Sequence, residues 1–576
     1  MQHLLSKIPF LIELFVNGSF ILLYSLRSTS YLPKSWSLEW VAGLLEAGAF
    51  FVPLVLFLVV IVNYMNSHGF EEFLRKYVFS IIVFVPLLIT WGDLEFTFWL
   101  SSAHLLSSVL SLYDDNEEQS YDEDFKEKSQ FFHGIINRPH QMVLFSFTGV
   151  ILLGTFLLLL PVSSIDGKGM TFSDALFMAT SATCVTGLST LSIATKFSLF
   201  GQMVILFLIQ IGGLSIMTLY SLSAILLGKS MGLKDRITMQ GLLDVSSLED
   251  LFIIIVDIVK YTFLIELWGG IVLTIGFTFE GFEFGQALYY GFFHAISAFC
   301  NAGFSLFETS LESYATKPLI NGTIVILVFL GGLGFIVMKE IQEVVRSGKS
   351  IVRLGLHTKV VVTTTVLLTI TGFLFIFFGE FLNALDHFTL FEKFQVALFQ
   401  SVTLRTAGFN TIPLTNLNNY TLYAMTLFMF IGGSPGSTAG GIKSTTLAIL
   451  VQSIKSTLKS EKDVIVFGRK IPGQLVVRAT ALTFISILFT SFFILVMMKL
   501  EPEQEFLPLF FEVISAGGTV GLSLGITPQL TLMGKFAISA LMLVGRIGPL
   551  TLMLAIGQKS MGSGKIDYPD GRIMIG

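Results

Sequence analysis

The sequence predicts an all-α polytopic membrane protein in which a span, a half-helix and a second span recur four times, after three or four further N-terminal helices. Two bulk observations support this: the mean hydropathy is +0.78, and hydrophobic residues make up 53% of the 576-residue chain. In addition, many apolar runs reach about 20 residues, the length that crosses a ~30 Å hydrocarbon core as a helix. A β-barrel would show short alternating segments instead.

The N-terminal region differs from the rest of the chain. We expect residues 1–112 to form transmembrane helices from apolar runs near 9–26, 38–64 and 77–112. The first run lacks a small-residue cleavage site, so it reads as a retained helix rather than a signal peptide. Loop charges fit three or four helices equally well. Residues 113–134 form an acidic linker, expected to be cytoplasmic and solvated, with a regulatory contact as the minority interpretation.

Four short stretches of the chain share one layout, and we call them the glycine stretches. They read SATCVTGLS (181–189), SAFCNAGFS (297–305), SVTLRTAGFN (401–410) and SAGGTVGLS (515–523). They align on Gly187, Gly303, Gly408 and Gly521. A serine precedes the glycine by six residues in three copies and by seven in the third. Such a repeat predicts four copies of one structural unit.

Each glycine stretch follows an apolar run of roughly ten residues, which is too short to span a bilayer and predicts a re-entrant half-helix. These runs are 174–183, 286–299, 394–404 and 506–516. Full-length apolar segments flank them at 141–161 and 199–228, 250–277 and 319–338, 358–381 and 420–455, and 474–498 and 532–557. We therefore expect repeats at 135–228, 229–345, 346–458 and 459–576, the last including the C-terminal tail.

Loop charge predicts the orientation of these repeats. The links between repeats and the tail are rich in Lys and Arg, whereas the segments between the two spans of each repeat hold few: Lys168, Lys196, Lys317, Lys393, Arg405 and Lys499. The positive-inside rule then puts the links and the C-terminus in the cytoplasm and the half-helices outside. The outer segments are acidic and would concentrate cations, although ordinary solvated loop charges explain them equally well.

The glycine stretches also predict a chemistry. Non-helical backbone at membrane depth is tolerated only when it is buried in protein or lines a water-filled path. Four such loops would place rings of carbonyl oxygens around one axis, where they can replace the water shell of a monovalent cation. The half-helices would point their partially negative C-terminal ends at that axis, and glycine reaches positive φ at little cost.

Several other functions are not indicated. The eight histidines show no metal-ligand spacing, and two cysteines, Cys184 and Cys300, are too few for a disulfide framework. No glycine-rich nucleotide loop and no basic stripe for nucleic acid occurs. The sequence therefore predicts neither an enzyme nor a nucleic-acid-binding protein.

The motifs TCVTGL, CNAGFS, RTAGFNT, GTVGLS, GGSPGSTAGGIK (432–443) and GRIGPLT (545–551) resemble the Trk/Ktr/HKT superfamily of potassium transporters. The resemblance covers roughly residues 135–560. It implies four M1–pore-helix–M2 units forming a potassium-channel-like pore in one chain, and homodimers with one pore per subunit. It also implies a separate cytosolic, nucleotide-binding regulatory subunit, for which the chain carries no domain of its own.

The resemblance further assigns the ion site. By this resemblance, carbonyls of the glycine stretches line a K⁺ filter at Val185, Thr186, Gly187, Asn301, Ala302, Gly303, Thr406, Ala407, Gly408, Thr519, Val520 and Gly521. Serine in place of the first glycine is associated with sodium preference in the family, so Gly187 suggests potassium. The two cysteines occupy equivalent positions, where packing behind the filter is a simpler role than redox chemistry.

The stretch 432–443, here called the glycine-rich loop, interrupts the second span of the third repeat. In family members it obstructs the pore and moves for conduction, which implies a gate of Gly432, Gly433, Ser434, Gly436, Ser437, Thr438, Gly440 and Gly441. A packed kink is the alternative. Arg546 lies in an apolar segment where an exposed charge costs ~2.5–3.5 kcal/mol. We therefore expect its side chain to face the interior beside this loop and to add a positive barrier.

The sequence thus predicts potassium uptake across the cell inner (cytoplasmic) membrane by a multi-pass protein in contact with membrane lipid, driven by the membrane potential. Whether Na⁺ or H⁺ is a coupling ion stays open. One alternative is a sodium-transporting or poorly selective protein of the same fold. Another is a membrane sensor that uses the N-terminal helices and keeps a degenerate pore.

Overall fold

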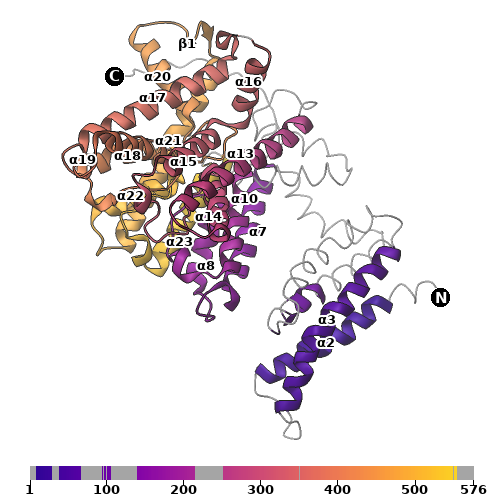
Figure 1. Ribbon diagram of the computed structural model, residues 1–576. Coiled ribbons are helices and arrows are strands. Elements are labelled where there is room, and N and C mark those ends of the chain that lie inside the picture. The colour runs from indigo at the N-terminus through magenta and orange to yellow at the C-terminus, as the bar shows by residue number, and fades with distance from the viewer. Residues whose placement is uncertain are drawn as a thin grey trace. The chain divides into compact units, whose positions relative to one another are not determined.

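The computed structural model of the chain describes residues 8–28, 38–66, 94, 97–98, 100–105, 139–214, 251–348, 350–548 and 551–553 (Figure 1). The chain divides into two compact units, residues 1–133 and 134–576.

The first unit contains a helical pair, α2 (Ile8–Ser28) and α3 (Leu38–Asn66). Phe20 of α2 packs beside Gly48 of α3, where the absent side chain leaves room for the ring. Tyr24 stacks on Phe98 with ring centroids 4.3 Å apart. The predicted choice between three and four N-terminal helices falls mostly outside the described residues.

The second unit repeats the order span, half-helix, span. The first spans are α7 (Pro139–Leu159), α13 (Leu251–Phe279), α17 (Leu356–Gly379) and α21 (Gly473–Leu500). The half-helices are α8 (Phe172–Thr183), α14 (Phe284–Phe299), α18 (Leu390–Thr403) and α22 (Phe506–Gly518). The second spans are α10 (Leu199–Leu214), α15 (Pro318–Leu333) with α16 (Phe335–Arg346), α19 (Asn419–Met429) with α20 (Ser444–Leu458), and α23 (Leu532–Ile547). Short α9 (Ile193–Lys196) and the hairpin β1 (Ile465–Val466) and β2 (Arg469–Lys470) complete it. The predicted fold class is confirmed.

Two of the four half-helices, α18 and α8, begin at a side-chain N-cap. Thr389 and Glu392 form a reciprocal capping box at the start of α18, and Thr171 Oγ1 accepts the amide of Asp174 at 3.2 Å in α8. Such caps satisfy amides that have no partner within the helix. Each half-helix then ends inside its glycine stretch, so the helix and the loop that follows it form one rigid unit.

The second span of the second repeat bends. α15 and α16 meet at 103°, so the full-length segment predicted at 319–338 is not one continuous helix. The bend lies at Gly334, which has φ +90°, and the amide of Phe335 bonds to Gly436 O at 3.1 Å instead of continuing the helix. α23 ends at Ile547 with Gly548 (φ +91°) as its C-cap, residues 551–553 are again helical, and the end of the predicted segment 532–557 lies outside the described residues. Glycine allows both breaks because positive φ costs it little.

Length and composition identify membrane-crossing helices among the described residues. Three helical segments qualify, Ile255–Phe279, Leu356–Gly379 and Gly473–Leu500, and a fourth qualifies if the bent pair α15 and α16 counts as one span. Val143–Leu159 and Leu199–Leu214 are apolar but shorter. These helices lie around the half-helices and hold them in place.

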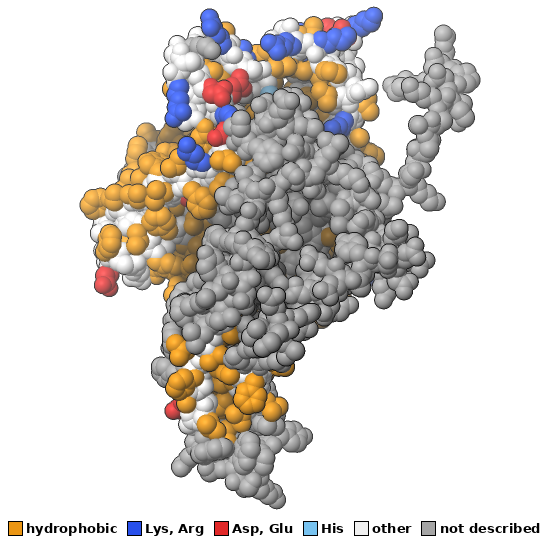
Figure 2. Space-filling view, turned by 90° about the vertical axis from the view of Figure 1, so that its right-hand side faces the viewer, with side chains coloured by type: hydrophobic (Ala, Val, Ile, Leu, Met, Phe, Trp, Pro, Cys, Tyr) orange, Lys and Arg blue, Asp and Glu red, His pale blue; other side chains and the backbone are white. Residues whose placement is uncertain are grey.

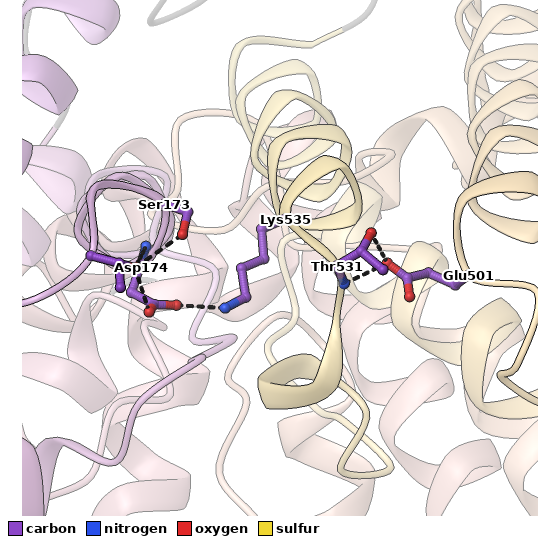
Figure 3. A network of polar contacts seen from close by, with 6 residues as sticks. Ser173, Asp174, Glu501, Thr531 and Lys535 are labelled. Carbon is purple, nitrogen blue, oxygen red and sulfur yellow. Dashed lines mark hydrogen bonds and ion pairs between the residues drawn. The ribbon is translucent and has the colours of Figure 1, made fainter.

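An ion pair closes the second unit by joining its last repeat to its first (Figure 3). Lys535 Nζ of α23 lies 2.7 Å from Asp174 Oδ1 of α8, and both side chains are mostly buried. On the other side of α23, Glu501 Oε1 accepts the amide and hydroxyl of Thr531 at 2.8 and 2.7 Å. The start of α23 is therefore held by acids from repeats one and four.

Basic side chains gather at one end of the second unit. Figure 2 shows Lys and Arg at the end where Figure 1 labels β1, α16 and α20, next to a mainly apolar flank. α16 ends at Arg346, α20 holds Lys455, and β2 is Arg469–Lys470.

We expect replacement of Lys535 by Met to destabilise the protein by about 2 kcal/mol, since it leaves Asp174 buried without its cation. Thermal unfolding in detergent measures the loss, and adding Asp174→Asn should restore part of it. Lys317→Met is the matched control, because its pair with Glu280 (2.8 Å) leaves the lysine side chain 42% exposed. Equal losses for the two lysine variants would contradict the assignment.

Candidate functional site

The backbone of the four glycine stretches follows one pattern. The residue two before each aligned glycine has positive φ: 56° at Val185, 58° at Asn301, 65° at Thr406 and 52° at Thr519. The glycines themselves have φ of 95°, 69°, 77° and 94° in the same order. Positive φ is a genuine outlier for a β-branched residue, and such strain persists only where the surrounding structure enforces it.

The four glycines approach the next stretch in a closed cycle. A Cβ added to any of them would lie within 2.7 Å of the carbonyl oxygen of the residue that precedes the next glycine. The pairs are Gly187 with Ala302 (2.5 Å), Gly303 with Ala407 (2.7 Å), Gly408 with Val520 (2.6 Å) and Gly521 with Thr186 (2.2 Å). The order runs from repeat one through four and back to one, so the predicted residues come together around one axis.

Side-chain hydroxyls hold these loops. Ser181 Oγ accepts the amide of Gly187 at 3.1 Å, and Ser515 Oγ accepts that of Gly521 at 3.0 Å. In the second repeat, Ser297 Oγ donates to Phe304 O at 2.8 Å. These bonds give the serine that lies six residues before the glycine a structural role.

The third repeat, with one extra residue, uses a different hydroxyl. Thr403 Oγ1 donates to Phe409 O at 2.7 Å, while Ser401 Oγ turns outward to Thr369 O of α17 at 2.7 Å. In the third repeat Thr403 therefore holds the loop, as the serine does in the other three repeats, and Ser401 bonds to α17 instead.

A cavity of about 400 Å³ opens on one side of the four glycines, and all four line it. Glu308 and Glu312 line it too. Glu312 Oε1 accepts the amide of Asn410 at 2.7 Å, which ties the outer loops of repeats two and three together. Burial raises the pKa of Glu312, and the bond from Asn410 opposes that rise. The cavity is thus an acidic vestibule that favours cations.

The glycine-rich loop lies between α19 and α20 and contacts the bend of the second repeat. The amide of Ser434 donates to Gly332 O at 3.0 Å, and that of Thr438 to Gly331 O at 3.2 Å. Ser434 Oγ also donates to Leu333 O. These bonds satisfy the last carbonyls of α15, which the bend leaves without helical partners.

The same loop reaches the glycine stretch of the fourth repeat. A Cβ at Gly440 would lie 2.1 Å from Thr519 Oγ1, so the loop backbone passes directly against that side chain. The loop also closes on itself, because the amide of Gly432 donates to Ile442 O at 2.8 Å. It is a compact loop rich in glycines and hydroxyl groups.

Arg546 of α23 donates to two backbone carbonyls, with Nη1 bonding to Thr438 O in the glycine-rich loop and Nη2 to Gly212 O near the end of α10. Its guanidinium therefore connects the loop with the second spans of repeats one and four. The sequence prediction that this side chain lies beside the loop agrees with these contacts.

Sequence reasoning missed the surroundings of two charged residues, Arg405 and Glu266. Arg405 counted there as an outer loop charge, but it is only 7% exposed, at the third position before Gly408. Glu266 of α13 is buried, with Gln210 Nε2 at 3.2 Å and Cys300 Sγ at 3.8 Å. The sequence did offer one signal for the burial of Arg405, because this charged residue lies inside one of the four aligned glycine stretches. Nothing in its apolar span marked the partners of Glu266.

Both cysteines are buried and free, and a Cβ at Gly213 would lie 2.5 Å from Cys300 Sγ. This tight fit supports a packing role. Among the described residues, no group of three or more His, Cys, Asp or Glu side chains could hold a metal ion.

Comparison with known proteins identifies the family. The family described as TrkH, cation transport protein, matches residues 125–566. The chain belongs to the TrkH family of cation transport proteins. The resemblance to the Trk/Ktr/HKT superfamily is thereby confirmed. The chain is a multi-pass membrane protein and an ion transporter rather than an enzyme, as the sequence predicted.

Individual relatives agree with this family. The Ktr system potassium uptake protein B of Bacillus subtilis (strain 168) is 37% identical over 440 residues, 76% of this chain and 97% of the relative. The potassium/sodium uptake protein NtpJ of Enterococcus hirae is 37% identical over 444 residues, with the same shares. The crystal structure of the potassium transporter TrkH from Vibrio parahaemolyticus matches with a TM-score of 0.57 at 18% identity, over 88% of this chain and 97% of that one. It shows a shared fold.

We expect Gly521→Ala to abolish cation uptake, because its Cβ would meet Thr186 O at 2.2 Å. Gly525→Ala is the matched control: its φ is +89°, close to the +94° of Gly521, but nothing lies within 4 Å of an added Cβ. It should retain uptake, at a cost in stability of about 1 kcal/mol. Uptake assays on reconstituted protein compare the two. An equal loss of uptake in the two variants would show that backbone strain at positive φ, rather than the close approach of residue 521 to Thr186 O, is the cause.

Proposed function

We propose that this chain carries K⁺ inward through a pore formed by its four glycine stretches, with the membrane potential as driving force. The observation that carries the proposal is the closed cycle in which each aligned glycine meets the carbonyl before the next. Carbonyl rings of this kind replace the hydration shell of a monovalent cation. A potential of 100 mV contributes ~2.3 kcal/mol per charge, a concentration ratio of roughly fifty.

The ion site in this proposal consists of the carbonyls of the three residues that end at each aligned glycine. The positive φ at alternate residues supports it, because such alternation turns successive carbonyls toward one side. K⁺ is favoured because relatives at 37% identity are named for potassium uptake and all four aligned positions hold glycine. Transport or coupling of Na⁺ is the second candidate, favoured by the name of the potassium/sodium uptake relative.

In the same proposal, the glycine-rich loop is the gate and Arg546 is its latch. The loop is compact, lies against Thr519, and is bonded to the carbonyls that the bend of α15 leaves free. The guanidinium adds positive charge on the path of a cation and fixes the loop through Thr438 O. Opening requires these bonds to break.

The surroundings of the pore complete the proposal. The relatives' names describe a Ktr system, which supports further subunits. A separate cytosolic, nucleotide-binding regulator would dock on the basic end formed by α16, α20 and the hairpin (Figure 2). This end and the C-terminus then face the cytoplasm, and two copies of the chain form a homodimer. Residues 1–112 add membrane helices and 113–134 a linker to the four pore repeats.

We expect purified protein in proteoliposomes with an inside-negative potential to take up K⁺ and Rb⁺ in preference to Na⁺. Gly187→Ser should reduce this preference, because the hydroxymethyl group meets Ala302 O and displaces the carbonyl ring. Ion fluxes measured in competition test both statements. Equal K⁺ and Na⁺ uptake by the wild type would refute the selectivity. Absence of any flux, with the glycine-rich loop opened by mutation, would favour the sensor alternative.

We expect Arg546→Met to raise K⁺ flux several-fold, because the loop loses the bond to Thr438 O and the pore loses a positive charge. Arg478→Met is the matched control, since Arg478 is an exposed arginine on α21. Its flux should equal that of the wild type. A lower flux in Arg546→Met with intact thermal stability would refute the latch.

A further inference from the structure

Arg405 is a buried cation beside the glycine stretch of the third repeat. It is 7% exposed, and its Nη2 donates to Thr365 Oγ1 of α17 at 3.3 Å. Its Nε has no hydrogen-bond partner among the described residues. Burying an ion that lacks part of its hydrogen bonds costs free energy of folding, so we expect the charge of Arg405 to have a function that offsets this cost.

The position of Arg405 has equivalents in the other repeats. The residue three before the aligned glycine is Cys184, Cys300 or Gly518 in repeats one, two and four. None of these three residues is charged, and in the third repeat, which has one extra residue, Leu404 caps the half-helix and Arg405 follows that cap. The charge breaks the fourfold symmetry of the ring next to Thr406, whose φ is 65°.

No acid neutralises this charge within the described residues. The buried acids bond elsewhere: Asp174 to Lys535, Glu266 to Gln210, Glu380 to Asn418, Glu501 to Thr531 and Glu512 to Ser523. The backbone end of α18 supplies partial compensation, since Arg405 lies just past Thr403 and helix C-termini are partially negative. The charge of Arg405 is therefore only partly compensated, and its backbone lies three residues before Gly408 of the ring.

We propose that Arg405 is a specificity-determining residue whose fixed charge disfavours divalent cations in the ring of carbonyls. This inference rests on the proposed K⁺ pore. Coulomb energy is proportional to the charge of the ion, so one fixed charge penalises a divalent ion twice as strongly as a monovalent ion at the same place. The ring itself, made of carbonyl dipoles, would otherwise hold a divalent ion of similar size more tightly than K⁺. Arg405 offsets that preference without touching the ion.

The test uses Ba²⁺, a divalent cation of nearly the size of K⁺, as an inhibitor of K⁺ uptake into proteoliposomes. Arg405→Met should lower both the half-saturating K⁺ concentration and the inhibition constant of Ba²⁺. The factor for Ba²⁺ should be the square of the factor for K⁺, for example about tenfold for Ba²⁺ if it is about threefold for K⁺. A merely structural role would move both constants alike or weaken both. Equal factors, or an unchanged Ba²⁺ constant, would overturn the proposal.

A second pair of variants tests the charge without removing Arg405. Thr365→Glu places a carboxylate against the guanidinium, while Thr365→Gln adds nearly the same volume without charge. The Glu variant should repeat the Ba²⁺ shift of Arg405→Met, and the Gln variant should leave the Ba²⁺ constant within twofold of the wild type. This pair decides the question if Arg405→Met fails to fold in thermal unfolding measurements. Similar Ba²⁺ constants for Glu and Gln would overturn the proposal. Absence of K⁺ flux even with the glycine-rich loop opened by mutation would refute the pore itself.

Discussion

The approach of each aligned glycine to the carbonyl that precedes the next glycine is the constraint on which the rest of the structure depends. These contacts leave no room for a Cβ at Gly187, Gly303, Gly408 or Gly521. These contacts also form a closed cycle, so a shift of one loop displaces the other three. Backbone conformations at positive φ, costly for Val185 and the threonines, persist because the cycle enforces them.

The scaffold around the cycle supplies that enforcement. The C-terminal ends of the half-helices set where each loop begins, and hydroxyl groups hold its glycine or the residue after it. The ion pair of Lys535 with Asp174, together with the hydrogen bond from Arg546 to Gly212 O, joins the last repeat to the first. A ring made from one chain needs such contacts, because its first and last repeats are not consecutive in the sequence.

The second spans do not share the fourfold symmetry of the glycine stretches, and this asymmetry has a clear physical origin. Only the third repeat carries the glycine-rich loop, only the second bends at Gly334, and only the fourth supplies Arg546. The three features meet through backbone carbonyls that the breaks leave without helical partners. Arg405 adds a further asymmetry beside the ring itself. Four similar repeats thus form one ring of glycine stretches whose surroundings differ from repeat to repeat.

The sequence by itself determined the fold class, the four repeats, and the residues that come together at the ring, because hydrophobic length and aligned glycines are local signals. It also indicated that Arg546 faces the interior, since an arginine in an apolar segment has few other options. Only the tertiary structure decided the bend at Gly334, the pairing of Lys535 with Asp174, and the burial of Arg405. Each of these depends on which distant segment lies opposite, and apolar periodicity carries no information about that partner.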